Sequence, residues 1–244
     1  VHAPIQVPEE WRDKYKGQFD DGWHAYRDQQ LERQKELGLV PEDAVMVDWP
    51  EVIPEWDSFS EEGKAYLSRQ MEVNAAFLEH VDHHIGRVID HIEELGELDN
   101  TMVVYLTADN GNTAEGTPTG TFSELLFQNG FPPLTMDQQL EKLEEFGGLD
   151  AWGGPHLANH YSVGWSYAGS TPYQWTKQIA SHFGGTMSAT AIRYPKAINA
   201  RGEWRRQFQN ITDLVPTILE VTGVPAPNYV NGQKREEYPG KSLT

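Results

Sequence analysis

One long amphipathic segment, residues 60–95, constrains the fold of this 244-residue chain more than any other feature. Its inward-facing positions recur at the three- and four-residue spacing of an α-helix. They are Leu67, Met71, Asn74, Phe77, Leu78, Val81, Ile85, Val88, Ile89 and Ile92. Ser60 followed by acidic residues favours a helix start, and Gly96 favours a stop. The spacing therefore predicts a single helix from about Ser60 to Leu95.

A strand-forming run, Met102–Leu106, follows this helix after a short loop. A helix, a short loop and a buried strand make half of an α/β unit. The run leads into Asp109-Asn110-Gly111, which as a tripeptide is first of all a turn former. At the carboxyl end of a strand, where open α/β sheets bind ligands, the same turn presents a carboxylate and an amide oxygen. These hard donors suit Ca²⁺ or Mg²⁺.

The amino-acid composition argues against several classes of function. The chain has 37 acidic and 19 basic residues, and a formal charge of −18 argues against general binding of nucleic acids or anionic membranes. No apolar run is long enough for a transmembrane helix. The chain has no cysteine, which excludes disulfides, thiolate metal sites and a cysteine nucleophile within it.

We expect three regions along the chain. Residues 1–60 are rich in Pro and Trp and read as a covering segment with one helix near Gly22–Leu37. Residues 61–224 form the α/β core, with a long active-site loop at 112–170. Residues 225–244 are a polar tail. Because the sequence begins with Val rather than Met and reads like the middle of a protein, we expect a fragment cut at both ends.

Four further elements are predicted within these regions. They are an acidic helix near Met136–Phe146, a helix near Pro172–Ser181, a strand at Met187–Tyr194 and a helix at Ile211–Val221. Pro216 lies in an early turn of the last helix or kinks it, and Gly223 ends it.

Five segments, taken in order, carry a family resemblance that spans nearly the whole chain. They are His2–Pro8; residues 15–39; residues 71–101; Asp109-Asn110-Gly111 with Glu115-Gly116; and Pro172–Lys177 with Gly184-Gly185, Arg193-Tyr194-Pro195 and Thr212–Thr217. In this order they resemble the sulfatase family, specifically its bacterial arylsulfatase branch. One segment is weak support, whereas five in order are specific.

The resemblance implies an alkaline-phosphatase-like α/β fold, a mixed and largely parallel sheet flanked by helices. It implies hydrolysis of small-molecule or glycan sulfate monoesters by a formylglycine nucleophile and a calcium ion. Asp109 and Asn110 match the late calcium ligands. Lys177 matches the lysine that touches the sulfate, and His2 the histidine that faces the sulfate and the leaving-group oxygen. A cation and an ammonium stabilise the charge of a sulfuryl group in transfer, and imidazole can supply a proton to the departing oxygen.

The chain also departs from the family pattern. It lacks the Cys/Ser-x-Pro-x-Arg motif that yields formylglycine and the early Asp pair, which we expect upstream of Val1. The small C-terminal sheet is expected beyond Thr244. We therefore predict that the isolated chain hydrolyses 4-nitrophenyl sulfate no faster than its Lys177→Ala variant.

Two alternatives to a sulfatase stay open. One is a phosphodiesterase or phosphonate monoester hydrolase of the same superfamily. The other is a non-catalytic scaffold that binds sulfated glycans or a protein partner. Assays on sulfate and phosphate esters distinguish the first alternative from a sulfatase. The presence or absence of the nucleophile motif in the gene distinguishes the second alternative from a sulfatase.

Several other side chains allow both a functional and a structural interpretation. His80 and His84 have the spacing of helical zinc ligands, but the pattern lacks a Glu at the required place, and we read these residues with Asp82 and His83 as boundary or surface. Asn112 and Glu115 either orient metal ligands or cap the turn. Among the remaining candidates, the histidines either line the substrate entrance or are structural, and the aromatic residues either stack on an aromatic or sugar ring of a ligand or pack locally. They are His156, His160, His182, Trp152, Tyr161, Trp165, Tyr167 and Tyr173.

Overall fold

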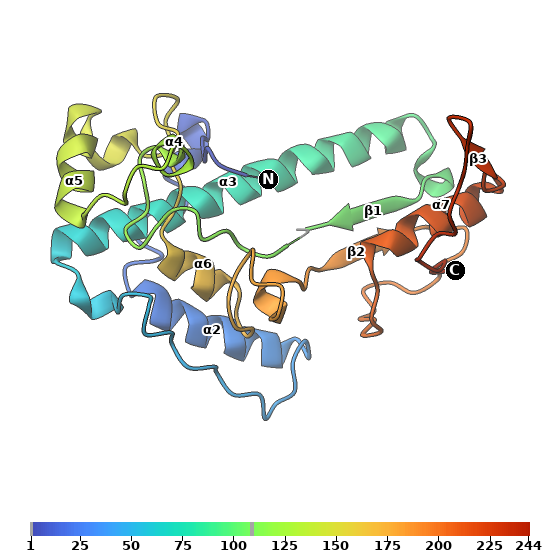
Figure 1. Cartoon of the computed structure of the whole chain (residues 1–244), viewed down its shortest axis with the longest axis horizontal. Helices are drawn as coiled ribbons and strands as arrows, with labels where there is room; N and C mark the ends of the chain where they lie inside the picture. The colour runs from blue at the N-terminus through green and yellow to red at the C-terminus, as the bar shows by residue number, and fades with distance from the viewer. Residues whose placement is uncertain (1, 108–109) are drawn as a thin grey trace. The chain divides into compact units, whose positions relative to one another are not determined.

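The computed structural model of this chain describes residues 2–107 and 110–244 and forms two compact units, residues 1–199 and 200–244. The helices and strands of the first unit are drawn in Figure 1. In chain order they are α1 (Glu9–Arg12), α2 (Gly22–Glu36), α3 (Glu61–Glu94), β1 (Val103–Leu106), α4 (Glu124–Gln128), α5 (Met136–Glu145), α6 (Val163–Gly169) and β2 (Thr190–Arg193). Short 3-10 helices are η1 (Trp56–Ser58), η2 (Leu98–Asn100), η3 (Gly148–Ala151) and η4 (Phe183–Gly185).

The predicted long helix is present as α3. The Ser60 side chain accepts a hydrogen bond from the backbone N–H of Gly63 at 3.2 Å, which satisfies one of the free donors of the first turn. Glu61 and Glu62 lie in that turn, where the helix dipole favours negative charge. Gly96, with a φ of +73°, follows the end of the helix. The capping residues therefore define both ends as expected.

The core gathers around the first half of α3. Trp23 of α2, Trp56 of η1 and Trp165 of α6 pack edge to face, with Trp23 ring centroids 4.9 Å from Trp56 and 5.8 Å from Trp165. The Trp165 indole donates a hydrogen bond of 2.7 Å to the carbonyl oxygen of Leu67 on α3. Residues 1–60, which we expected to cover the core, thus also supply part of it.

The strands β1 and β2 form an antiparallel pair, with Val103 opposite Arg193 and Leu106 opposite Thr190. The pair continues past β1, since the Thr107 amide donates to the Ala189 carbonyl oxygen at 3.1 Å. The predicted strands are confirmed and the chain is of mixed α/β class, but the pairings in the described residues are antiparallel rather than parallel. The first strand was expected to be buried, whereas the residues of β1 are half-buried or exposed. Strand patterning identifies a strand without giving the direction of its partner.

The segment 112–170, which we predicted to be a long loop, contains regular secondary structure. It contains α4, α5, η3 and α6, and it buries residues such as Trp152 and Trp165 in the core. The predicted acidic helix is α5, which begins with a capping box between Thr135 and Gln138.

The helix predicted near Pro172–Ser181 is wrong, because these residues form consecutive turns. Trp175 and Gln178 have φ values of +64° and +77°, which a right-handed helix does not allow. The local residues are compatible with a helix, but packing against the Gly184-Gly185 segment imposes the turns.

The second unit contains η5 (Ile211–Asp213), α7 (Leu214–Thr222) and a small antiparallel pair, β3 (Tyr229–Val230) and β4 (Gln233–Lys234). Its predicted helix is confirmed: Pro216 lies in the first turn of α7, and Gly223 ends the helix with a φ of +70°. Two backbone N–H donors, from Asn210 and Lys241, hold the pKa of Asp213 below its usual value. Across the described residues of both units, no helix has the length and apolar character of a bilayer-spanning segment.

Candidate active site

The turn that carries Lys177 is fixed by two close backbone contacts. The Lys177 amide donates to the Asn112 carbonyl oxygen at 2.8 Å. A Cβ atom on Gly184 would overlap the carbonyl oxygen of Trp175, so only glycine fits there. Gly111 has a φ of +78°, and a Cβ on it would overlap the carbonyl oxygen of Gly184. The Asn110-Gly111 turn and the Lys177 turn therefore pack directly on one another.

Glu115 lies between the two candidate catalytic residues. Its Oε1 atom is 3.6 Å from the Lys177 ammonium, and its Oε2 atom is 3.4 Å from Nε2 of His2. The Lys177 and Glu115 side chains are mostly buried, at 20% and 24% exposure, whereas His2 is half exposed. The structure thus brings His2 and Lys177 to one carboxylate although they are remote in the sequence.

The charge state of Glu115 follows from its neighbours. Burial by itself would raise the pKa of Glu115. The hydrogen bond from the Thr113 hydroxyl and the positive charges of Lys177 and His2 outweigh burial and hold the pKa below its usual value. Glu115 is therefore an ionised carboxylate at neutral pH.

Two buried titratable side chains, His160 and Glu124, lie near this carboxylate. His160 is fully buried, and its Nδ1 atom lies 2.9 Å from the Tyr161 carbonyl oxygen. Burial lowers the pKa of His160, so the ring is neutral at pH 7. Burial raises the pKa of the Glu124 carboxyl group, and the charges of His2, Glu115 and Lys177 also act on it. The His2 and His160 rings meet edge to face, with centroids 6.5 Å apart.

The predicted metal ligands are only partly visible. Asp109 lies outside the described residues, and Asn110 is half-buried at the start of its turn. The amide oxygen of Asn110 is the kind of hard donor that Ca²⁺ takes. The described residues contain no group of three or more His, Asp or Glu side chains arranged to hold a metal. The donor chemistry therefore suits calcium, but the described ligand set is incomplete.

The other histidines do not join the site around Glu115. His80 and His84 form a hydrogen bond to each other, with their Nε2 atoms 2.9 Å apart on α3. His156 is exposed. His182 is half-buried, with its Nδ1 atom 2.9 Å from the Ser181 hydroxyl.

The aromatic residues between Trp152 and Tyr167 are buried and serve packing. Trp152, Tyr161, Trp165 and Tyr167 are each at most 9% exposed. Tyr173 is half-buried, and its ring lies against Phe183 with centroids 5.7 Å apart. The packing interpretation therefore holds for the four buried residues.

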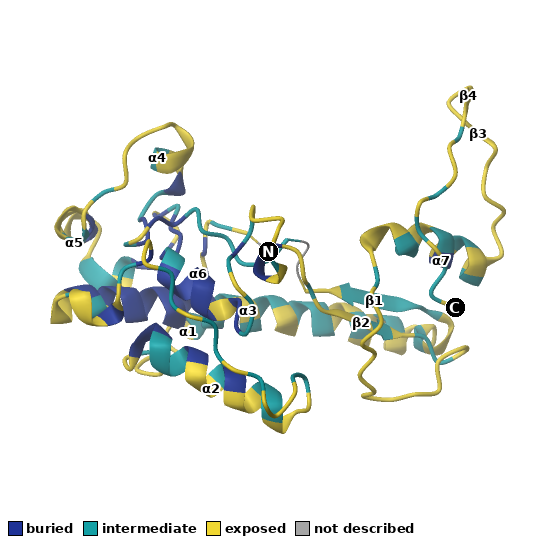
Figure 2. Ribbon diagram, turned by 60° about the horizontal axis from the view of Figure 1, so that its bottom comes forward, coloured by how far each residue is buried: buried dark blue, intermediate teal, exposed yellow. Residues whose placement is uncertain are grey.

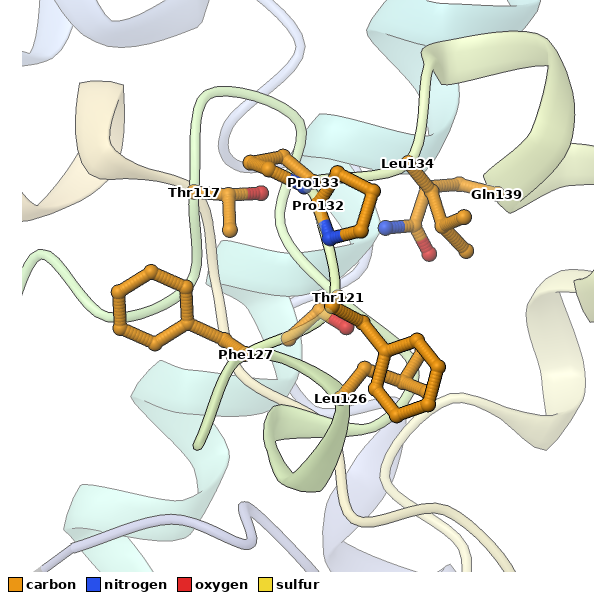
Figure 3. A pocket seen from close by; sticks show the side chains of 9 residues that line it. Thr117, Thr121, Leu126, Phe127, Pro132, Pro133, Leu134 and Gln139 are labelled. Carbon is orange, nitrogen blue, oxygen red and sulfur yellow. The ribbon is translucent and has the colours of Figure 1, made fainter. Parts of the chain in front are cut away.

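A small pocket lies next to this region, between α4, α5 and the loop that joins them (Figure 3). Its free volume of about 10 Å³ is close to that of one water molecule and is too small for an aryl ring. It is lined by Thr117, Thr121, Leu126, Phe127, Phe131, Pro132, Pro133, Leu134 and Gln139. His2, Glu115 and Lys177 are not among these lining residues, so the pocket does not mark the chemistry.

The sequence did not show that Glu115 lies between Lys177 and His2, and it did not indicate a role for Glu124. Glu115 follows the Asp-Asn-Gly turn closely, and this was the one available signal. Glu124 gives no signal, because an acidic residue at the start of a short helix is ordinarily a surface residue.

Comparison with known proteins identifies a family. A family model described as Sulfatase matches residues 1–224. The chain is 35% identical over 230 residues to an uncharacterized sulfatase of Schizosaccharomyces pombe, which covers 93% of this chain and 38% of that protein. It is 27% identical over 223 residues to an arylsulfatase of Klebsiella aerogenes, which covers 91% of this chain and 44% of that protein. The chain spans about two fifths of the length of these relatives.

Proposed function

Because the chain belongs to the sulfatase family, whose fold is alkaline-phosphatase-like, we propose that the full-length protein hydrolyses sulfate monoesters. One observation carries this proposal: Lys177 and His2 converge on the two oxygens of a single, mostly buried carboxylate. Beside them lies the Asn110-Gly111 turn, which packs on the Lys177 turn. This arrangement supports roles for Lys177 as a cation, for His2 as a proton donor and for Asn110 as an oxygen ligand.

These residues have complementary roles in the proposed reaction. Negative charge spreads over the sulfuryl oxygens as the ester bond breaks, and the Lys177 ammonium stabilises it. The departing oxygen needs a proton, and we assign its delivery to the His2 imidazole. Glu115 itself repels an anionic ester, so it acts on Lys177 and His2 rather than on the substrate.

Calcium and the nucleophile belong to the same proposal. Asp109 and Asn110 would hold Ca²⁺, which when bound supplies a positive charge to the sulfate oxygens. The nucleophile is proposed to be a formylglycine from sequence outside this chain, which itself has no cysteine. The substrate is proposed to be a small-molecule or glycan sulfate ester.

Hydrolysis of 4-nitrophenyl sulfate by the full-length protein tests the assignments. Lys177→Ala is expected to lower kcat roughly 10²- to 10³-fold, as loss of one group that stabilises charge in the transition state does. His2→Ala is expected to lower kcat by about 10²-fold or more. Lys142→Ala, which removes an exposed lysine of α5, is the matched control and should leave kcat unchanged.

The same assay has outcomes that would reject the proposal. Faster hydrolysis of 4-nitrophenyl phosphate or of a phosphodiester would assign the protein to the phosphate-ester alternative. Absence of activity on both ester types, together with a gene that lacks the Cys/Ser-x-Pro-x-Arg motif, would favour a binding scaffold.

The metal proposal has its own test. Treatment with EGTA should abolish hydrolysis, and added Ca²⁺ should restore it. Asn110→Ala should raise the Ca²⁺ concentration that half-restores activity, because it removes one oxygen ligand. Activity that is unaffected by EGTA and by this substitution would contradict the calcium assignment.

A further inference from the structure

The carboxylate of Glu115 divides its contacts between the two candidate catalytic residues. Oε1 lies 3.6 Å from the Lys177 ammonium and accepts a hydrogen bond from the Gln178 amide at 3.3 Å. Oε2 lies 3.4 Å from Nε2 of His2 and accepts from the Thr113 hydroxyl at 3.0 Å. Each oxygen thus contacts one of the two candidate catalytic residues and one neutral donor.

The carboxylate is itself held in place from the backbone side. The Glu115 amide donates to the Thr113 hydroxyl oxygen at 3.3 Å, so the residue is bound to Thr113 through both its backbone and its side chain. A Cβ on the next residue, Gly116, would overlap the carbonyl oxygen of Tyr161. The glycine therefore lets this segment press against residues 160–161, and Glu115 stands on a fixed backbone.

In the part of the chain that the structure describes, the Lys177 ammonium and the His2 ring have few other side-chain contacts. Among the described residues, Glu115 is the acidic side chain that pairs with the Lys177 ammonium and with the His2 ring. The other ring nitrogen of His2 lies 3.2 Å from the Ala3 carbonyl oxygen. A lysine has four rotatable side-chain bonds, so a turn that fixes its backbone does not fix its ammonium. Within the described ranges, Glu115 is the ion-pair partner of that ammonium.

We infer that Glu115 is a positioning residue that holds the Lys177 ammonium and the His2 imidazole at a set separation from one another. This inference rests on the proposed function and names a residue that acts on the reaction through two others. Each oxygen of Glu115 contacts a different catalytic candidate.

Substitutions of Glu115 in the full-length protein test the inference. Glu115→Gln keeps the shape and the hydrogen bond from Thr113 but removes the charge that attracts both partners. It is expected to lower kcat for 4-nitrophenyl sulfate roughly 10- to 100-fold, the usual effect of losing a residue that orients a catalytic group. KM should change less than about threefold, since the lost interaction concerns the transition state. Glu115→Asp keeps the charge and should recover part of kcat.

Glu145→Gln is the matched control for the glutamine substitution. Glu145 pairs with Lys142 at 2.7 Å on the exposed side of α5, so this variant breaks a lysine–glutamate pair away from the site. It should retain the kcat of the parent. The melting temperature of Glu115→Gln should fall no further than that of Glu145→Gln. A large fall in melting temperature with unchanged kcat would show a structural role and overturn the inference.

A crystal structure of the Glu115→Gln protein separates the inference from the proposed function. The Lys177 ammonium and the His2 ring should both leave the positions that they hold in the parent structure. If both stay in place, the positioning role is rejected whatever the activity. If Lys177→Ala and His2→Ala abolish activity while Glu115→Gln does not change it, the inference fails and the proposed function stands. If neither of those two variants affects hydrolysis, the proposed function fails, and the crystal structure still decides the inference.

Discussion

The two halves of α3 have the same apolar spacing but very different surroundings. Most residues from Gly63 to Ala76 are buried, and α2, α6 and the tryptophan cluster supply their neighbours. From Phe77 to Glu94 no residue is buried, although Val81, Ile85 and Val88 continue the pattern. Figure 2 shows this change along the helix, from dark blue to teal and yellow. An apolar stripe therefore states which face of a helix can be buried, but not whether anything covers it.

Charged side chains are also more buried in the first half of α3 than in the second. In the first half, Arg69 lies between Glu72 and Asp13, with its guanidinium nitrogens 3.1 Å and 2.6 Å from their carboxylate oxygens. In the second half, Glu79 and Lys14 pair at a more exposed position, and three histidines lie on neighbouring turns. Removing a group from the first half should therefore cost more than removing the same group from the second.

The largest expected difference comes from one substitution made in each half. Leu67 is 0% exposed and Leu78 is 49% exposed. Leu67→Ala should reduce the free energy of unfolding by about 2–5 kcal/mol, because it leaves a cavity among packed rings. Leu78→Ala should reduce it by less than about 1 kcal/mol. Urea denaturation of both variants measures the difference, and equal losses would show that the second half is also packed in the full-length protein.

A smaller difference is expected for the ion pairs. Glu72→Gln removes the charge that faces Arg69 and weakens the hydrogen bond that Glu72 accepts from the Gly17 amide at 2.7 Å. Because Glu72 is buried, we expect a loss of about 1.5–3 kcal/mol in denaturant unfolding. Glu79→Gln, the same change on the exposed half, is the control and should cost less. A larger loss at Glu79 would contradict the comparison.

The smallest expected effect is a pH dependence in the second half. Partial burial, followed by the charges of His80 and Arg87, holds the pKa of His84 below the usual value of 6.5. The unfolded chain then binds a proton more readily than the folded chain, so the contribution of His84 to stability is full above pH 6.5. It is lost as the pH falls from 6.5 toward the lower folded-state pKa. Protonation of both rings also removes the acceptor of the His80–His84 hydrogen bond.

Melting temperatures measured between pH 7 and pH 5 test this prediction. His84→Gln should make the fall in melting temperature with decreasing pH shallower. His91→Gln is the control, because His91 is exposed on the same helix and pairs with Glu94 rather than with another histidine. An unchanged slope in His84→Gln would show that the histidine pair does not sense pH.

Much of the site could be named from the sequence, but its geometry could not. The family resemblance selected His2, Lys177, Asp109 and Asn110, and their roles stay predictions. The structure shows that His2 and Lys177 both contact Glu115. From the sequence, Glu115 could equally be a residue that caps the turn or one that orients the metal ligands. No local pattern could reveal this, because the residues come from separate segments brought together by backbone contacts at Gly111, Gly116 and Gly184.

The sequence by itself determined the presence and approximate bounds of four helices, because caps and apolar spacing act within a few residues. The helices α2, α3, α5 and α7 follow from such local signals. Only the tertiary structure decided the antiparallel pairing of β1 with β2, the turns around Lys177 and the unequal burial of α3. These features depend on contacts between remote segments, and such contacts can override a local preference for a helix or leave an apolar face uncovered.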